Sequence, residues 1–410
     1  MTEKEFSAET IKYVNESNLN HRKELGQYFT PKFIRDELIK QLPKSIKNPK
    51  ILDPACGTGE FLLTAKEYFN KPELHGWEID GKLVKIANRL VPQANLIHID
   101  SLEKEEPSYY DFVIGNPPYF EFKPNQKITD KFQEIMNGRT NIFSLFIYQG
   151  LKLLKNGGYL AFVVPPSMNN GAYFSKLREF IVGNSNIEYL KVLKNPKIFH
   201  EALQSTMIIV LKKGKNRGSY IFRKNGLMIF SEETSRLKSA FNGKKTLSDL
   251  NYSVKTGRIV WNQNKHLLTN DSKNGHLLIW AHNITKEGLK LPVTHANKLQ
   301  YIKSELYDIG PAIVVNRITG SLNSTKLRSA VVPAGVRFLA ENHVNVIYPP
   351  SYFGKQISMD FIGKKDNDSF LLKKIANQLA SGVKMEILSS ITGNTQISKT
   401  ELERLVPLEI

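Results

Sequence analysis

Cysteine is nearly absent from this sequence of 410 residues, in which Cys56 is the only one. A chain with a single thiol cannot form an intramolecular disulfide, which excludes the small secreted scaffolds that disulfides hold together. Long apolar runs are also missing, since none approaches the ~20 residues that cross a bilayer. The N-terminal stretch MTEKEFSAETIKYVNESN is polar and mixed in charge, without the apolar core of a signal peptide. We therefore expect a cytoplasmic protein that makes no contact with a membrane.

Clusters of metal ligands are missing as well. The nine histidines are dispersed along the chain, and no Cys, His, Asp and Glu residues have the spacing of a zinc or calcium site, so no metal is expected. A nuclease cluster of the Pro-Asp…Glu-x-Lys type is absent too, so we do not expect this chain to cleave DNA. Hydrophobic residues make up 41% of the sequence and aromatic residues 10%, which is enough for packed cores. The length predicts two domains.

Positive charge is abundant but uneven. The formal net charge is +18, and residues 1–210 hold 27 Lys and Arg against 24 Asp and Glu, whereas residues 211–410 hold 30 against 15. A positive excess confined to one half indicates that this half lies against a polyanion. A merely soluble basic surface stays open as the alternative.

Short apolar strands alternate with helical patterns in the first half. Strands are predicted within 50–57, 73–80, 94–100, 110–115, 159–164, 187–193 and 206–213, and helices at 60–69, 82–90 and 142–154. This alternation predicts a doubly wound α/β fold, with a mainly parallel sheet covered by helices on both faces. Ligands of such sheets bind beyond the carboxyl ends of the strands.

The stretch DPACGTGEF begins at Asp53, where the first strand ends. Gly57 and Gly59 allow a tight turn and the close approach of a ligand to the backbone. The stretch is neither a phosphate loop, because no Gly-Lys-Ser/Thr follows, nor a dinucleotide fingerprint, because the G-x-G-x-x-G spacing is not met. Glu78 ends the second strand, where a carboxylate can accept both hydroxyls of a ribose, and Asp100 ends the third, where it can meet an adenine amino group. Three acids at three successive strand ends favour a nucleoside pocket.

The fourth strand ends in Asn-Pro-Pro-Tyr, residues 116–119. The two prolines stiffen the backbone, so that the side-chain oxygen of Asn116 and the carbonyl of Pro117 can point at one spot. Two acceptors at one spot suit a substrate –NH2 group, which offers two donors. Holding both N–H bonds from one side favours a pyramidal nitrogen whose lone pair faces an electrophile. Tyr119 then supplies a flat face on which a base can stack.

Together, NPPY and DPACGTGEF resemble the adenine-N6 DNA methyltransferases, which use S-adenosyl-L-methionine. GQYFTP (residues 26–31) is similar to the family segment that closes over the methionine end of the cofactor, and LLKNGGYLAFVVPPS to the later core helix and strand. KIFHEALQSTMIIVLKK is similar to the segment that carries a second stacking aromatic, here Phe199. The order of these segments resembles the gamma class, the TaqI-like enzymes, in which a target-recognition domain follows the catalytic domain.

The resemblance implies a Rossmann-like S-adenosylmethionine-dependent catalytic domain over residues 1–240 and an α+β target-recognition domain over residues 241–410. The cofactor-binding residues that it implies are Tyr28, Thr30, Asp53, Ala55, Gly57, Glu78, Ile79, Asp100, Ser101 and Asn116. Asn116 and Pro117 would bind the target amine, while Tyr119 and Phe199 would sandwich the base. After Asp100 the sequence reads SLEKEEP instead of the family's apolar pair. The ring that stacks on the cofactor adenine therefore stays open between Phe120 and Phe122.

The implied activity is sequence-specific transfer of a methyl group to the N6 amine of a flipped-out adenine in double-stranded DNA. A duplex hides this amine inside the stack, so the base must flip out. The enzyme is expected to be a monomer and to serve as the modification enzyme of a restriction–modification system, with a cognate endonuclease acting separately. Two alternatives remain: an RNA adenine-N6 methyltransferase would share the pocket and the charge, and a protein-glutamine N5 methyltransferase also uses Asn-Pro-Pro-Tyr but lacks a large basic C-terminal domain.

The second half mixes short strand patterns with Arg, Asn, Gln, Ser and Thr, as in VKTGRIVWNQNK and PAIVVNRITGSLNSTKL. These side chains read base edges and hold phosphates. The tail SSITGNTQISKTELERLVPLEI is similar to the closing segment of recognition domains in gamma-class and Type I specificity proteins. Arg317 and Gln396 are the candidate base-reading residues.

Overall fold

The computed structural model describes residues 2–104, 108–193, 206–291, 298–317, 327–350, 365–381 and 397–410. Phe199 and Gln396, two of the predicted functional residues, lie outside these ranges. The chain forms two compact units, the first made of Met1–Ile221 with Met228–Glu232 and the second of Phe222–Leu227 with Glu233–Ile410. Over the ranges described, no helix has the length and apolar character needed to cross a bilayer.

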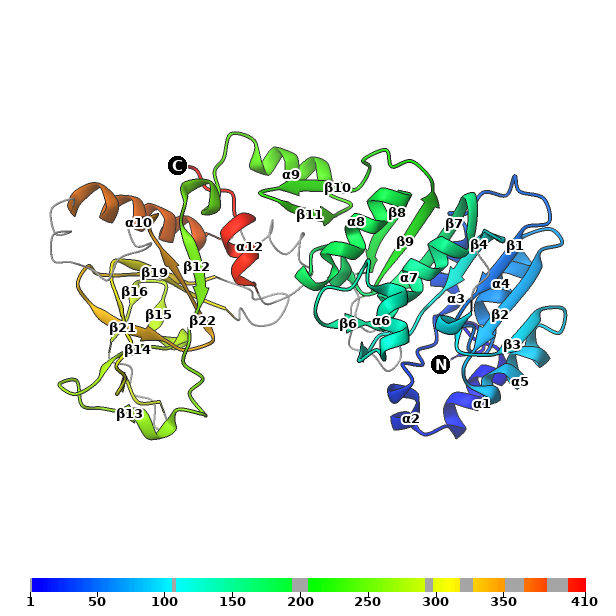
Figure 1. The fold of residues 1–410 in the computed structure, drawn as a ribbon, viewed down its shortest axis with the longest axis horizontal. Helices are drawn as coiled ribbons and strands as arrows, with labels where there is room; N and C mark the ends of the chain where they lie inside the picture. Colours follow the sequence, from blue (N-terminus) through cyan, green and yellow to red (C-terminus); the bar gives the residue numbers. More distant parts are fainter. Residues whose placement is uncertain are drawn as a thin grey trace. The chain divides into compact units, whose positions relative to one another are not determined.

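A seven-stranded sheet forms the centre of the first unit, in the order β3-β2-β1-β4-β7-β9-β8 (Figure 1). Its strands are β1 (Lys50–Asp53), β2 (Glu73–Glu78), β3 (Asn95–His98), β4 (Tyr110–Gly115), β7 (Leu154–Val164), β8 (Ser185–Leu193) and β9 (Thr206–Lys213). The strands from β3 to β7 are parallel, and β9 runs antiparallel to both of its neighbours. The predicted doubly wound, mainly parallel sheet is therefore confirmed.

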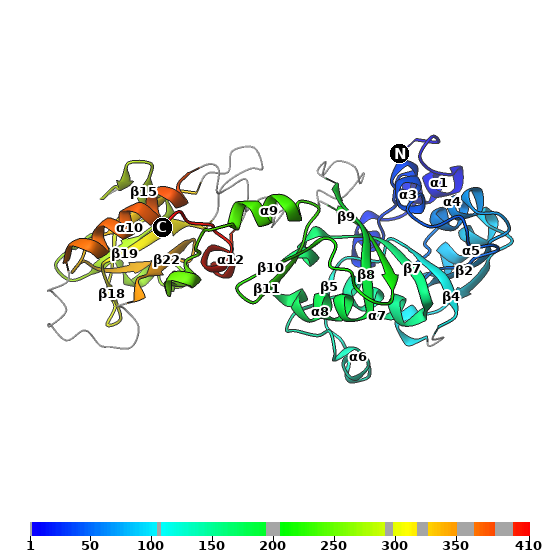
Figure 2. The same ribbon diagram turned by 90° about the horizontal axis from the view of Figure 1, so that it is seen from above.

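Helices cover both faces of this sheet (Figure 2). One face carries α3 (Lys32–Ile39), α4 (Glu60–Tyr68) and α5 (Gly81–Leu90), and the other α6 (Gln126–Phe132), α7 (Ile142–Leu153) and α8 (Ser175–Asn184). Alternate residues of β4 face the two layers: Phe112 and Ile114 pack in the cluster with α3 and α4, and Val113 packs in the cluster with α7. A strand buried on both faces must be apolar throughout, which explains its continuous apolar run.

The strand order reverses direction between β1 and β4. From β1 the chain moves outward to β2 and β3, then returns to β4 on the opposite side of β1. Such a reversal opens a crevice at the carboxyl ends of the two central strands, because the connections leave them in opposite directions. Asp53 is the last residue of β1, and Asn116 directly follows β4. The topology alone thus brings these two side chains to one crevice.

Helices α1 (Ala8–Glu16) and α2 (Leu19–Glu24) precede α3 and were not predicted from the sequence. Ser7 caps α1 by accepting a hydrogen bond from the backbone N–H of Thr10. The 26–31 segment connects α2 to α3. Two short paired strands, β5 (Glu121–Phe122) and β6 (Thr140–Asn141), follow the Asn-Pro-Pro-Tyr tetrad and precede α7.

The second unit contains a four-stranded sheet, a five-stranded sheet, a shorter strand pair and separate helices, an α+β architecture. The first sheet is antiparallel, in the order β12 (Ser253–Thr256), β22 (Val344–Tyr348), β19 (Ala312–Asn316), β20 (Ser329–Val332). The second has the order β13 (Leu268–Thr269), β17 (Tyr301–Ile302), β14 (His276–Ile279), β21 (Arg337–Ala340), β18 (Asp308–Ile309). Its only parallel pair is β14–β21 among the strands described. The remaining α-helices and strands described along the chain are β10 (Ile221–Lys224) and β11 (Leu227–Phe230), whose residues are divided between the two units, and α9 (Thr234–Phe241), β15 (Ile284–Thr285), β16 (Gly288–Leu289), α10 (Lys365–Leu379) and α12 (Lys399–Arg404) of the second unit.

Gly115, at the end of β4, provides a test of how closely the two central strands approach. Its φ is +145°, and an added Cβ would lie 2.6 Å from Oδ1 of Asp53. Gly214 is a matched control, because its φ is +138° and no atom lies within 4 Å of its Cβ position. Both alanine variants carry backbone strain of roughly 1–3 kcal/mol, but only Gly115→Ala adds a steric clash. Thermal unfolding should therefore show a larger loss of stability for Gly115→Ala than for Gly214→Ala. Equal losses of stability would contradict the close approach of Gly115 to the Asp53 carboxyl.

Candidate active site

A cavity of about 380 Å³ lies at the carboxyl ends of β1, β2 and β4, within the size range of small-molecule sites. Its wall is built from the 26–31 segment, the turn after β1, the ends of β2 and β3, the tetrad after β4, and α7. The cavity brings together Tyr28, Thr30, Asp53, Ala55, Gly57, Glu78, Ile79, Asp100, Ser101 and Asn116. These are the residues that the resemblance assigns to the cofactor. Pro117 and Tyr119 are not part of the cavity wall.

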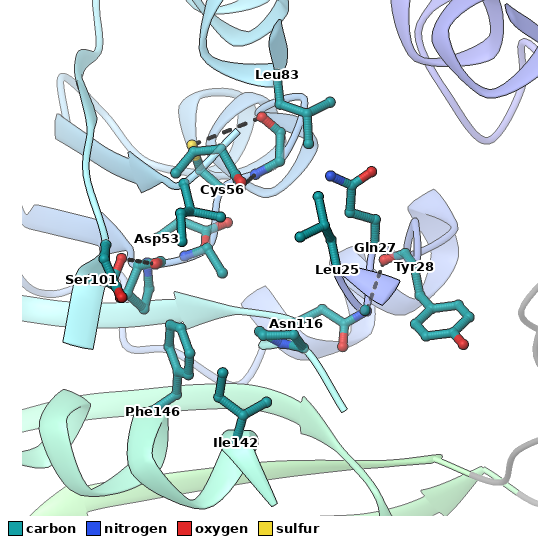
Figure 3. Close-up of a pocket in the computed structure, with 18 of the residues that line it drawn as sticks. Leu25, Gln27, Tyr28, Asp53, Cys56, Leu83, Ser101, Asn116, Ile142 and Phe146 are labelled. Atoms are coloured by element: carbon teal, nitrogen blue, oxygen red, sulfur yellow. Dashed lines mark hydrogen bonds between the residues drawn. The ribbon is translucent and has the colours of Figure 1, made fainter. Parts of the chain in front are cut away.

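Two groups of side chains face each other across this space (Figure 3). Asp53 and Ser101 lie on one side, Gln27 and Tyr28 lie opposite, and Phe146 of α7 forms part of the floor. The wall contains the acids Asp53, Glu60, Glu78, Asp100 and Glu103, and none of the described residues that line it is a lysine or arginine. A cavity wall that carries acids and no described lysine or arginine favours a cationic ligand.

Asp53 is buried, with a relative exposure of 1%. Its Oδ1 accepts a hydrogen bond of 3.1 Å from the backbone N–H of Ala55. Burial, with a smaller contribution from the neighbouring charge of Glu78, raises the pKa of Asp53 to about 8. A carboxyl group poised near neutral pH gains its charge readily when a cation arrives beside it.

Glu78 organises the glycine turn. Its Oε2 accepts from the backbone N–H of Gly57 at 2.9 Å and its Oε1 from that of Asp80 at 2.9 Å. Each carboxylate oxygen can accept a second bond, so the side chain retains acceptor capacity toward the cavity. Gly57 has a φ of +55° and no atom within 4 Å of its Cβ position, which leaves the space in front of the turn open. Burial raises the pKa of Glu78.

Asn116 is held in one orientation. Its Nδ2 donates a hydrogen bond of 3.1 Å to the backbone carbonyl of Tyr28, and Figure 3 shows this bond. Because Nδ2 is engaged there, Oδ1 is the atom left for a substrate. The Tyr119 hydroxyl contacts this Oδ1 and also lies 2.8 Å from the carbonyl of Val163. One hydroxyl carries one proton, so it serves one of these two acceptors at a time.

The ring of Tyr119 is half-buried. It lies nearly parallel to the ring of Tyr28, with an interplanar angle of 18° and centroids 6.4 Å apart, and Phe143 meets its edge at 6.3 Å. Burial raises the pKa of Tyr119 well above its ordinary value. The phenol therefore stays protonated and acts as a donor near neutral pH.

Several residues of the cavity wall were missed by sequence reasoning. Glu60 directly follows the glycine turn, so its position could have been inferred from the motif. Phe146 lies on α7, which is apolar on nearly every side, so no periodic signal marked it. Phe120 and Phe122, the two candidates for stacking on the cofactor adenine, both line the cavity.

This sheet order, with an acid-rich cavity over a glycine turn, suits the class of S-adenosylmethionine-dependent methyltransferases. The model of the N-6 DNA Methylase family matches residues 12–267, which is more than half of the chain. The protein belongs to this family. Its activity is S-adenosylmethionine-dependent methylation of adenine N6 in DNA, as the resemblance implied.

Curated relatives support this assignment. The chain is 26% identical over 366 residues to the Type II methyltransferase M.CvrRI of Paramecium bursaria Chlorella virus XZ-6E, covering 88% of this chain and 92% of the relative. It is 33% identical over 201 residues to the Type II methyltransferase M.HincII of Haemophilus influenzae, covering 47% of this chain but only 38% of that protein. Among solved structures, the Type I restriction enzyme EcoKI M protein matches with a TM-score of 0.39 and 20% identity, covering 46% of this chain and 44% of that one.

The cavity fits S-adenosylmethionine on its own evidence. The ligand carries a sulfonium and an ammonium group, and the wall supplies acids without a lysine or arginine among the residues described. The buried hydroxyl of Thr30 has no hydrogen-bond partner in the described structure and lies in this wall. Such an orphaned polar group is expected where a ligand completes the site.

The raised pKa of Asp53 predicts a pH-dependent stability. Because the folded pKa is about 8 and the reference value is 3.8, the stability that it contributes is complete below about pH 4 and is lost as the pH rises toward 8. Asp53→Asn removes this loss. Thermal unfolding of the cofactor-free protein between pH 6 and 9 should show that the stability of Asp53→Asn increases relative to that of wild type as the pH rises. If the stability of wild type and of the variant changed with pH in the same way, the raised pKa of Asp53 would be ruled out.

Proposed function

We propose that this protein is a monomeric gamma-class enzyme of the cytoplasm that methylates one specific site in double-stranded DNA. It serves as the modification enzyme of a restriction–modification system, whose endonuclease acts separately. Residues 1–240 carry the chemistry and residues 241–410 recognise the target. The observation that carries the proposal is the position of Asn116, whose oriented amide lines the cofactor cavity directly after β4.

Asn116 and Pro117 act as the amine clamp. The bond from Nδ2 to the Tyr28 carbonyl fixes the amide plane, so Oδ1 is preset to accept one hydrogen of the target amine. The backbone carbonyl of Pro117 accepts the other. An aromatic amine is a weak nucleophile because its lone pair is delocalised into the ring, and this clamp favours the pyramidal form. S-adenosylmethionine supplies a methyl group already activated by the positive sulfur, and the product amine loses its proton to solvent.

Tyr119 has two roles in this scheme. Its ring offers a stacking face to the flipped adenine, opposite Phe199, which lies outside the described residues. Its hydroxyl can move its single proton from Asn116 Oδ1 to the Val163 carbonyl, since both acceptors are within reach. This exchange frees Oδ1 for the substrate and leaves the buried phenol hydrogen-bonded.

Target recognition is assigned to the basic second unit. Arg317 directly follows β19, and its backbone N–H donates to the carbonyl of His343 at 2.8 Å. Its guanidinium makes one long contact, 3.5 Å from Nη1 to the carbonyl of Asn342, in the part of the chain described. The remaining donors suit a bidentate contact with guanine. Gln396, the other candidate, lies outside the described residues.

The choice of macromolecule is tested directly. Methyl transfer from labelled cofactor is measured in parallel to duplex DNA, to RNA of the same sequence and to protein. We expect label in the duplex alone, and a scrambled duplex should remain unlabelled. Label in RNA or on protein glutamine would replace the proposal with one of the two alternatives.

Asn116→Ala should nearly abolish turnover, because it removes an acceptor that acts in the transition state. Losses of roughly 10²–10³-fold in kcat are typical for such groups. Cofactor affinity, measured by calorimetry without DNA, should change little. Single-turnover methylation of a cognate duplex reports the chemical step. A variant that methylates at near wild-type rate would refute the clamp.

Substitutions of Tyr119 separate the ring from the hydroxyl. Tyr119→Phe should retain activity because it keeps the stacking face and frees Asn116 Oδ1, at the loss of the hydroxyl's bond to the Val163 carbonyl. Tyr119→Ala should weaken binding of the flipped base by about 1–3 kcal/mol. A duplex with 2-aminopurine at the target reports flipping by fluorescence. Equal enhancement with wild type and Tyr119→Ala would contradict the stacking role.

A further inference from the structure

A buried ion pair joins two helices next to the cofactor cavity. Arg35 of α3 and Glu60 of α4 have relative exposures of 2% and 6%. Nη2 of Arg35 lies 2.8 Å from Oε2 of Glu60. Burying two charges requires that both be well compensated by their surroundings. Neither residue takes part in the amine clamp.

Arg35 also holds the 26–31 segment. Its Nη1 donates to the backbone carbonyl of Thr30 at 2.7 Å, while its Nε donates to Oγ1 of Thr64 at 2.9 Å. Thr30 lines the cavity together with the rest of the segment up to Gly26. The guanidinium therefore connects the segment to α4 from the side away from the ligand.

Glu60 provides the matching connection to α1. Its Oε1 accepts from both the backbone N–H and the hydroxyl of Ser7, each at 2.8 Å. A second link lies beside it, where the hydroxyl of Thr10 donates to that of Thr58 at 2.8 Å. Glu60 and Thr58 both line the cavity. One carboxylate thus fastens the N-terminal helix and Arg35 to the start of α4.

We infer that Arg35 and Glu60 are positioning residues that fasten the 26–31 segment to the glycine turn and thereby set the affinity and residence time of S-adenosylmethionine. The inference rests on the cofactor shared by the family and on the proposed assignment of Thr30 to its site. Two separate chain segments form opposite parts of the wall, and this pair connects them directly. Loss of either charge leaves the other buried without a partner, so the segment must shift away from α4.

A purely structural role makes a different prediction. If the pair only stabilises the fold, a variant with restored stability binds the cofactor normally. If the pair positions the segment, cofactor affinity stays weak even when stability returns. The double variant Arg35→Met/Glu60→Leu separates the two cases, because apolar replacement of a buried ion pair often preserves stability.

The experiment measures S-adenosylmethionine binding to the full chain by calorimetry without DNA, and its release by stopped-flow displacement. For Glu60→Gln and for the double variant we expect the Kd to rise about tenfold or more, which corresponds to about 1.4 kcal/mol. Release should be faster, and amide hydrogen exchange over residues 26–31 should increase. For Arg35→Lys, at a residue that does not line the cavity, the kcat at saturating cofactor and duplex should remain within about twofold of wild type, so that the effect appears in KM for the cofactor.

Asp111→Asn is a control at a less buried ion pair. Asp111 Oδ1 forms an ion pair of 2.8 Å with Lys155 Nζ in the same unit, and neither residue lines the cavity. This variant should lose some stability and keep wild-type cofactor affinity. A comparable rise in Kd for Asp111→Asn would mean that general destabilisation explains the effect and would overturn the inference.

A stable double variant with wild-type Kd would also overturn it. Should the double variant fail to fold, Arg35→Lys decides, because lysine keeps the charge but lacks the fork that reaches Thr30, Thr64 and Glu60 together. We expect weakened cofactor binding for Arg35→Lys, and wild-type binding would contradict the inference. Methylation of duplex DNA by the wild-type protein is measured separately. If the wild type transferred no methyl group to DNA, the proposed function would be refuted, but the result on cofactor binding would still stand.

Discussion

Asp53 ends β1 and Asn116 directly follows β4, and these two strands pair in parallel with Ile51 opposite Phe112 and Leu52 opposite Val113. This pairing is the constraint on which the site depends, because it fixes how near Asp53 lies to Asn116, the proposed amine clamp. The contact is close enough that only glycine fits at position 115 beside the Asp53 carboxyl. Methyl transfer needs donor and acceptor in near-contact geometry, and here the distance between their binding groups is set by backbone hydrogen bonding within one sheet.

The same arrangement explains the electrostatics of the cavity. Strand ends supply acids, the glycine turn supplies backbone N–H groups, and none of the described wall residues supplies a positive side chain. Burial disfavours charge on Asp53 and Glu78, so both carboxyl groups are primed to gain stability from a cationic ligand. Arg35, a buried cation that bonds to residues of this wall, is committed to Glu60 and to backbone carbonyls. The charges of Asp53 and Glu78 are therefore left for the ligand to balance.

The central sheet could be predicted because each strand is a continuous apolar run that ends in a polar motif. Asp53, Glu78, Asp100 and Asn116 were placed at one edge of the sheet for the same reason. Contacts between residues far apart in the sequence could not be predicted from such strand patterns. The hydroxyl of Tyr119 reaches Val163 from 44 residues away, and the mixed polar sequence before β1 gave no sign of α1 or α2. In the second unit, strands of two to five residues pair with strands that are far away in the sequence. Sequence patterns this short do not predict which strands pair or in what register.

The central claim is that the oriented amide of Asn116 directs a methyl group to the exocyclic amine of adenine. The most direct measurement is nucleoside analysis of a duplex after turnover with labelled S-adenosylmethionine, by digestion, chromatography and mass spectrometry. The account predicts that the label is recovered as N6-methyladenine from one sequence context. Recovery as 5-methylcytosine would place the methyl group on a ring carbon, where an amine clamp has no role, and would contradict the account.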